Sequence, residues 1–99
     1  MLFRSRDFLL RNQDEIREIA GRFNIKSIKV YGEIASRSEK YDSDLELLFE
    51  HPQHFSLFDQ VAFLNELTIL LRRRVSLASP DCQLFKDHPE LFENTVEIL

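Results

Sequence analysis

The sequence predicts a small α/β fold in which helices and strands alternate along the chain. Runs with apolar residues three and four apart, typical of amphipathic helices, alternate with short runs in which every second residue is apolar, typical of strands. The 99 residues, 43% of them hydrophobic, suit one domain covering residues 1–99. No repeat, low-complexity segment or linker divides the chain. The expected order is helix, strand, short helix, strand, helix, strand, helix.

The first two expected elements are an amphipathic helix over residues 5–23 and a strand over residues 25–31. The apolar positions of the helix recur at helical spacing between charged residues: Ile16, Ile19, Ala20 and Phe23. Asn24 is expected to close the helix in a left-handed turn. Gly32 closes the apolar run of the strand, and a short helical or loop piece is expected between it and the next strand.

The second strand, residues 43–50, leads into the longest predicted helix. His51 and Pro52 end the strand, because proline disrupts the ladder. Ser56 and Asp59, three residues apart, match the capping box that begins a helix. The apolar residues that then recur at helical spacing are Leu57, Val61, Leu64, Leu67 and Leu71.

A short third strand is expected over residues 74–78, RVSLA, and a final helix from Pro89 to the end of the chain. In the strand, Val75 and Leu77 would face the core. Ser76 would then lie on the opposite face, beside Asp44 and Glu46 if the strands are neighbours.

Asp44 and Glu46 form the main candidate site. Residues two apart in a strand share a face, so both carboxylates point one way while Leu45 and Leu47 point the other. Such a pair suits a divalent cation. Two acidic residues on the solvent face of a half-buried strand are also common without any site, and the pair alone leaves both interpretations open. The histidines, at positions 51, 54 and 88, lack the spacing of a metal site.

Composition excludes several function classes. A net charge of −4 and a pI near 5.3 argue against a general nucleic-acid binder. The basic run Arg72–Arg74 suits a helix C-terminus, although contact with an acidic partner or a phosphate is the alternative. The lack of an 18-residue apolar run argues against a membrane span. The single cysteine, Cys82, and the lack of a cleavage-site pattern near the start lead us to expect a cytoplasmic protein.

The segment from Gly32 to Leu47 resembles the active-site segment of minimal nucleotidyltransferases, the smallest members of the DNA polymerase beta superfamily. That family carries Gly-Ser after its first strand, then Ala-Arg-Gly, then Ser-Asp-x-Asp-Leu. The chain matches this pattern without insertion or deletion at Gly32, Ala35, Ser43, Asp44 and Leu47. The resemblance implies a small nucleotidyltransferase-like fold, with a mixed three-stranded sheet flanked by about four helices.

The resemblance also assigns roles. Asp44 and Glu46 would be the catalytic carboxylates and hold Mg²⁺, and the nucleotide-binding residues for ATP would be Gly32, Glu33, Ser36 and Arg37. The chain departs from the family at several of these positions. Glu33 replaces a serine that binds phosphate, Ser36 and Arg37 replace Arg-Gly, and Glu46 replaces an aspartate. Ser76 stands where a later strand of the family carries a third carboxylate.

These departures leave three hypotheses, of which the resemblance implies the first two. In the first, a catalytically weak or inactive nucleotidyltransferase-like antitoxin neutralises a HEPN-domain ribonuclease toxin by binding it, and no cofactor is needed. In the second, the chain is an active AMP transferase that uses Mg²⁺ and ATP to modify the toxin. In the third, it is a non-catalytic nucleotide-sensing domain that forms a homodimer through apolar residues of the last helix.

Overall fold

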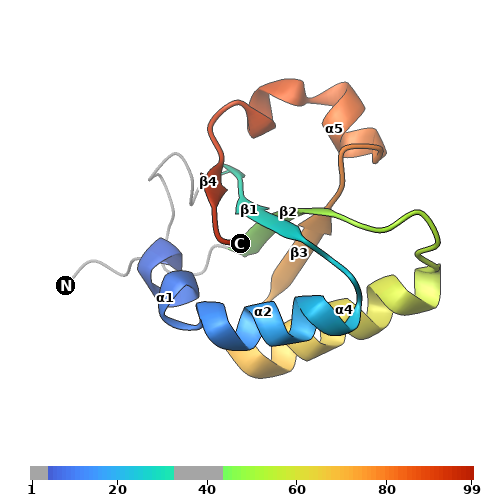
Figure 1. Cartoon of the computed structure of the whole chain (residues 1–99). Helices are drawn as coiled ribbons and strands as arrows, with labels where there is room; N and C mark the ends of the chain where they lie inside the picture. The colour runs from blue at the N-terminus through green and yellow to red at the C-terminus, as the bar shows by residue number, and fades with distance from the viewer. Residues whose placement is uncertain (1–4, 33–43) are drawn as a thin grey trace.

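The computed structural model describes residues 5–32 and 44–99 (Figure 1). The elements in chain order are α1 (Ser5–Arg11), α2 (Gln13–Arg22), β1 (Ser27–Val30), β2 (Leu45–Glu50), α4 (Leu57–Leu71), β3 (Val75–Ala78), α5 (Gln83–Asp87), the 3-10 helix η1 (Pro89–Phe92) and β4 (Val96–Glu97). The predicted α/β class and the alternation of helices and strands are confirmed. The connection expected between residues 32 and 44 falls largely outside the described residues.

In the part of the chain that the structure describes, the sheet has four strands in the order β3-β2-β1-β4, so the expectation of three strands is wrong. It is mixed, as the resemblance implied, because β1 is antiparallel to both β2 and β4 while β2 and β3 are parallel. The fourth strand arises from the C-terminal segment, where a helix was expected. Pro89 begins only one 3-10 turn, and the chain then extends through Val96 and pairs with β1.

The prediction of a single first helix is also wrong, because the segment forms two helices with a break at Asn12. The Asn12 side chain donates a hydrogen bond from Nδ2 to the carbonyl of Phe8 at 2.9 Å. An asparagine that bonds to nearby backbone in this way competes with regular helix geometry. The break lets Leu9 on α1 and Ile16 on α2 both reach the core.

Two predicted signals at helix ends are confirmed, and a third end is seen only in the structure. Asn24 has a φ of 58° and closes the segment after α2. At the start of α4, Ser56 Oγ accepts from the backbone N–H of Asp59, and the Asp59 carboxylate accepts from the backbone N–H of Ser56, both at 3.0 Å. Arg72 ends the helix in the left-handed region, with a φ of 54°.

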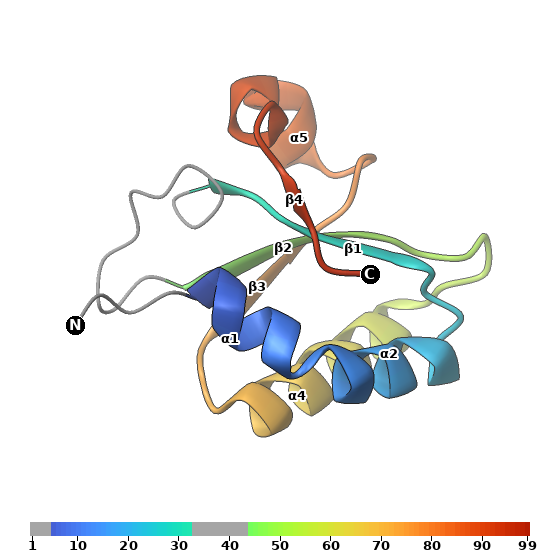
Figure 2. The ribbon, with the colours of Figure 1, turned by 60° about the vertical axis from the view of Figure 1, so that its left-hand side comes forward.

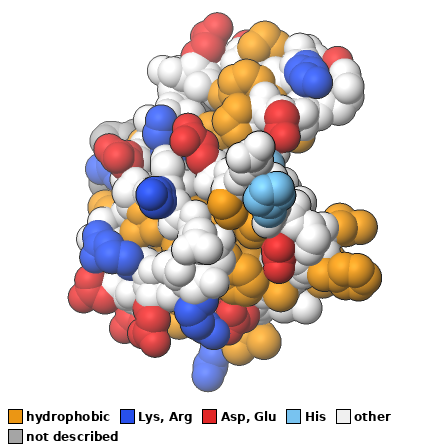
Figure 3. Space-filling view, turned by 45° about the vertical axis from the view of Figure 1, so that its right-hand side comes forward, with side chains coloured by type: hydrophobic (Ala, Val, Ile, Leu, Met, Phe, Trp, Pro, Cys, Tyr) orange, Lys and Arg blue, Asp and Glu red, His pale blue; other side chains and the backbone are white. Residues whose placement is uncertain are grey.

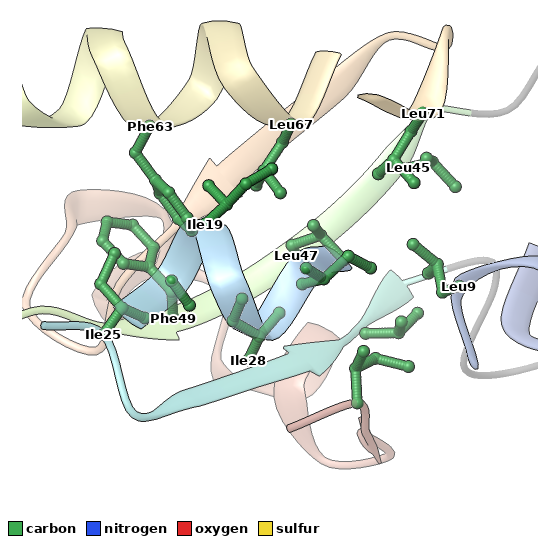
Figure 4. Close-up of a cluster of buried hydrophobic side chains, with 14 residues drawn as sticks. Leu9, Ile19, Ile25, Ile28, Leu45, Leu47, Phe49, Phe63, Leu67 and Leu71 are labelled. Atoms are coloured by element: carbon green, nitrogen blue, oxygen red, sulfur yellow. The ribbon is translucent and has the colours of Figure 1, made fainter. Parts of the chain in front are cut away.

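The hydrophobic core lies between the sheet and the helices α1, α2 and α4, which cover one face of the sheet (Figures 1 and 2). Alternation along the strands supplies the sheet side of this core, with Leu45, Leu47 and Phe49 buried on β2. Side chains from α2 and α4 meet them, among them Ile19, Phe63 and Leu67 (Figure 4). The opposite face of the sheet carries α5 and η1 (Figure 2).

No described helix is both long enough and apolar enough to cross a membrane.

Candidate functional site around Glu46

The candidate site lies where β1 ends and β2 begins, on the sheet face away from the main core. Leu45 and Leu47 are buried in that core, so Glu46 between them points to the other face, as the alternation predicted. The backbone N–H of Tyr31, just after β1, donates to the carbonyl of Glu46 at 3.0 Å. This hydrogen bond fixes the end of β1 directly beside Glu46.

Gly32 lies against the Glu46 side chain. Its φ of +71° falls in the left-handed region, where a glycine has no steric penalty. A Cβ added to Gly32 would collide with the Glu46 carboxylate, chiefly with Oε2. The absence of a side chain at position 32 therefore makes room for the carboxylate. The role of Gly32 in binding a nucleotide phosphate stays a prediction.

Ser76 is the register partner of Glu46 in the parallel β2–β3 pair. Partners in register share a face, so the serine hydroxyl and the Glu46 carboxylate lie on the same side, as predicted. The Ser76 side chain is hydrogen-bonded to the phenol of Tyr31. The position from which a third carboxylate would face Glu46 thus carries a hydroxyl that is bonded to a neighbouring side chain.

Tyr31 is a member of the site that the sequence pattern did not reveal. Its side chain is only 2% exposed, and its ring lies 4.5 Å, between centroids, from that of Phe92 on η1. Burial raises the pKa of the Tyr31 phenol above its ordinary value, and the nearby negative charge of Glu46 raises it further. The hydrogen bond with Ser76 acts in the opposite direction. Tyr31 therefore stays protonated at neutral pH.

Asp44 makes an ion pair with Arg74, a residue that the sequence analysis placed in the basic run after a helix and at the start of the expected third strand. Arg74 Nε lies 3.0 Å from Asp44 Oδ1, and the two residues flank the starts of the paired strands β3 and β2. The backbone brings them together, since the N–H of Leu45 donates to the Arg74 carbonyl at 2.9 Å. A cation that used Asp44 as a ligand would have to compete with this guanidinium. The contact depends on the parallel pairing of β2 with β3, which the sequence pattern does not indicate.

The described residues do not complete a metal centre of the two-ion type. Two-ion catalysis places both ions between converging ligands, commonly three or more carboxylates. Among residues 5–32 and 44–99, no group of three or more His, Cys, Asp or Glu side chains could hold a metal ion. Asp44 and Glu46 offer two carboxylates two residues apart in the sequence, and the Asp44 carboxylate is already paired with Arg74. The other predicted nucleotide-binding residues, Glu33, Ser36 and Arg37, lie outside the described residues.

Cys82 and His51 make contacts within the fold that involve neighbouring residues. Cys82 precedes α5, and its Sγ accepts a hydrogen bond from the backbone N–H of Phe85 at 3.4 Å. His51 stacks on Phe55 and its Nε2 lies 3.5 Å from a carboxylate oxygen of Asp81. The pKa of Asp81 is lowered, first by its hydrogen bond with Ser79 and also by His51.

Solved structures share this arrangement of strands and helices. A protein provisionally assigned as a minimal nucleotidyltransferase superposes with a TM-score of 0.75 at 21% sequence identity, covering 91% of this chain and 92% of the other. The chain has the nucleotidyltransferase fold. Two crystal structures of toxin-antitoxin assemblies, one with AMP-PNP and one of an MntA-HpeT mutant, match with TM-scores of 0.70 and 0.69. Both share 11% identity over 89% of this chain and 73% of the other.

No family model matches the sequence, and no curated protein matches it. Within the nucleotidyltransferase fold, the expected mixed α/β arrangement of this chain is confirmed, with four strands in place of three.

Proposed function

We propose that this chain is a nucleotidyltransferase-fold antitoxin that neutralises a HEPN-type ribonuclease toxin by direct binding and has little or no transferase activity. The matches to toxin-antitoxin structures support the antitoxin role. The main support for a loss of activity is the set of side chains around Glu46, which lacks a further unpaired carboxylate among the described residues. The register partner of Glu46 is Ser76, and the neighbouring Asp44 is paired with Arg74. A reducing, cytoplasmic location is part of the proposal.

One observation favours the alternative, an AMP transferase acting on the toxin. Asp44 and Glu46 lie on either side of the buried Leu45 in the sequence, so strand alternation would place both carboxylates on one face of the sheet. One of the matching structures was crystallised with AMP-PNP. In this alternative Asp44 and Glu46 would hold Mg²⁺, and the phosphates of ATP would contact Gly32, Glu33, Ser36 and Arg37.

The deciding experiment incubates the chain with Mg²⁺ and α-labelled ATP, alone and with the HEPN-type toxin, and follows both label and complex on gels. A stable complex without label supports binding alone. Label on the toxin supports the transferase and contradicts the proposal. A result with neither a complex nor label on the toxin contradicts both.

A reversal experiment tests why activity is lost. The double variant Glu33→Ser with Ser76→Asp restores the serine and the carboxylate of the resembled family, and we expect it to gain Mg²⁺-dependent transfer. The matched control replaces Ser76 with Asn in the same background, which is close to Asp in size but uncharged. Equal activity in the Asp and Asn variants would show that the missing carboxylate is not the cause.

A further inference from the structure

The outer face of α4 is apolar although it faces solvent. Leu57 and Phe58 are 76% and 87% exposed, and Ile69 is 75% exposed. Among the described residues, these are the most exposed large hydrophobic side chains. Figure 3 shows hydrophobic side chains projecting at the lower right of the molecule, in the region where α4 begins. A helix that is apolar all round is normally covered on every side.

Among residues 5–32 and 44–99, packing within the chain covers only the inner face of α4. Phe63, Leu67 and Leu71 are buried against the sheet and α2. At one flank, Glu66 forms an ion pair with Arg22 of α2, with 2.8 Å between Glu66 Oε1 and Arg22 Nη2. The outer face between Leu57 and Leu71 carries no charged residue, in a sequence with 30 Asp, Glu, Lys and Arg residues among 99. Such a surface suits contact with another protein surface.

Counted from Asn65, exposed residues of α4 and its C-cap occur at the same spacing toward both ends of the helix. Asn65 is central, Val61 and Ile69 lie four residues to either side, and Phe58 and Arg72 lie seven to either side. A second α4 packed antiparallel about a two-fold axis at Asn65 therefore places Val61 against Ile69 of the other copy. A surface that matches itself in this way is the requirement for a symmetric dimer.

Charge and polarity favour the same arrangement. Antiparallel packing brings Arg72 of one copy to Phe58 of the other, where a guanidinium and an aromatic ring attract each other. Arg72 then also lies near the acidic first turn that contains Asp59. The two Asn65 side chains meet on the axis, and a central asparagine among apolar residues fixes the register of packed helices.

From these observations we propose that the outer face of α4 binds a second copy of this chain, antiparallel and in the register set by Asn65. This dimer is independent of catalysis and of the toxin. It differs from the homodimer considered from the sequence, which used the last helix, a segment that is strand and 3-10 helix in the structure. One helix makes a small interface, so the dissociation constant is expected on the order of 10 to 100 µM.

The first test is sedimentation of the full chain across a concentration series. Ile69→Asp is expected to weaken self-association by roughly tenfold or more, since it places a carboxylate in the apolar contact. The control Leu10→Asp changes a residue of α1 that is 41% exposed and lies off this face, and it should leave association unchanged. Circular dichroism checks that both variants fold. A natural chain that stays monomeric throughout the series overturns the proposal.

The second test measures the register by disulfide formation in a Cys82→Ser background. Asn65→Cys is expected to cross-link with its own copy. Val61→Cys and Ile69→Cys should each cross-link poorly alone but readily when the two variants are mixed. Association that persists without this pattern would place the interface elsewhere. A chain that is monomeric alone but protects α4 only when mixed with the toxin would make the face a toxin contact and overturn the dimer.

Discussion

At position 32, backbone conformation and side-chain crowding both require a residue without a Cβ, which is glycine. The φ of +71° disfavours any residue with a Cβ, and the Glu46 carboxylate occupies the place where that Cβ would lie. The sequence indicated that a glycine closes the strand here. It could not indicate that the neighbouring carboxylate depends on it, because the contact joins β1 and β2 through their pairing.

We expect Gly32→Ala to destabilise the protein by about 1–3 kcal/mol, from the unfavourable φ and the displacement of Glu46. Urea unfolding followed by circular dichroism measures the change. Gly21 is the matched control, because a Cβ added there has no atom within 4 Å. Gly21 is the second-last residue of α2, and Gly21→Ala there should stabilise by about 0.4–1 kcal/mol. Equal effects of the two substitutions would contradict this account of Gly32.

The pKa of Tyr31 gives a prediction for high pH. Because burial and Glu46 raise this pKa, the folded protein holds the phenolic proton more tightly than the unfolded chain does. The resulting stabilisation is complete below the ordinary value of 10.0 and is lost as the pH rises through the folded-state pKa. Tyr31→Phe should therefore flatten the fall in stability at alkaline pH.

Absorbance titration of tyrosinate tests the cause of this shift. In a Tyr41→Phe background, which leaves Tyr31 as the remaining tyrosine of the chain, Glu46→Gln should lower the pKa of Tyr31 because it removes a nearby negative charge. Ser76→Ala should raise it, since the hydrogen bond that lowers it is lost. An unchanged titration in Glu46→Gln would mean that the Glu46 charge does not contribute to the raised pKa of Tyr31.

At the scale of elements, local signals predicted where segments start and end better than they predicted whether a segment is helix or strand. The capping box at Ser56 and the left-handed Asn24 depend on residues close in sequence, and both were predicted. The last segment was assigned wrongly because its state depends on pairing with β1, a partner far away in the sequence. The break at Asn12 was missed because the apolar spacing on both sides is helical.

The capping box of α4 should make a measurable contribution to stability. Ser56→Ala removes the oxygen that accepts from the Asp59 N–H, and we expect a loss of about 1 kcal/mol in the free energy of unfolding. Thr68→Ala is the control within the same helix. The Thr68 hydroxyl donates to the Leu64 carbonyl on the exposed side, and its removal should change stability by no more than about 0.5 kcal/mol.

At the scale of the whole molecule, the C-terminal segment joins parts that are distant in sequence. The N–H of Ile98 donates to the Ile28 carbonyl at 2.9 Å, and Gln13 Nε2 donates to the Ile98 carbonyl at 2.7 Å. The Ile98 side chain is 1% exposed. Strand β4 thus covers the edge of β1 and connects the sheet to α2. The fold class could be predicted without it, since alternation alone indicates α/β, but the strand order could not.

Ile98→Ala is expected to lower the free energy of unfolding by about 2–4 kcal/mol, as for other large core truncations. Glu97→Ala, on the exposed side of β4, is the control and should have little effect. Hydrogen exchange of the β1 amides adds a local readout, and we expect faster exchange in Ile98→Ala. Unchanged stability in that variant would mean that burial of the Ile98 side chain is dispensable for the fold.

The packing of Tyr31 also gives the molecule an internal optical reporter. The chain contains no tryptophan and two tyrosines, so in a Tyr41→Phe variant excited at wavelengths that phenylalanine does not absorb, the emission comes from the ring beside Glu46 and Ser76. An adjacent carboxylate quenches tyrosine fluorescence by accepting the phenolic proton in the excited state. A cation or nucleotide arriving at Glu46 would change that quenching, and occupancy of the candidate site could be followed without any attached dye.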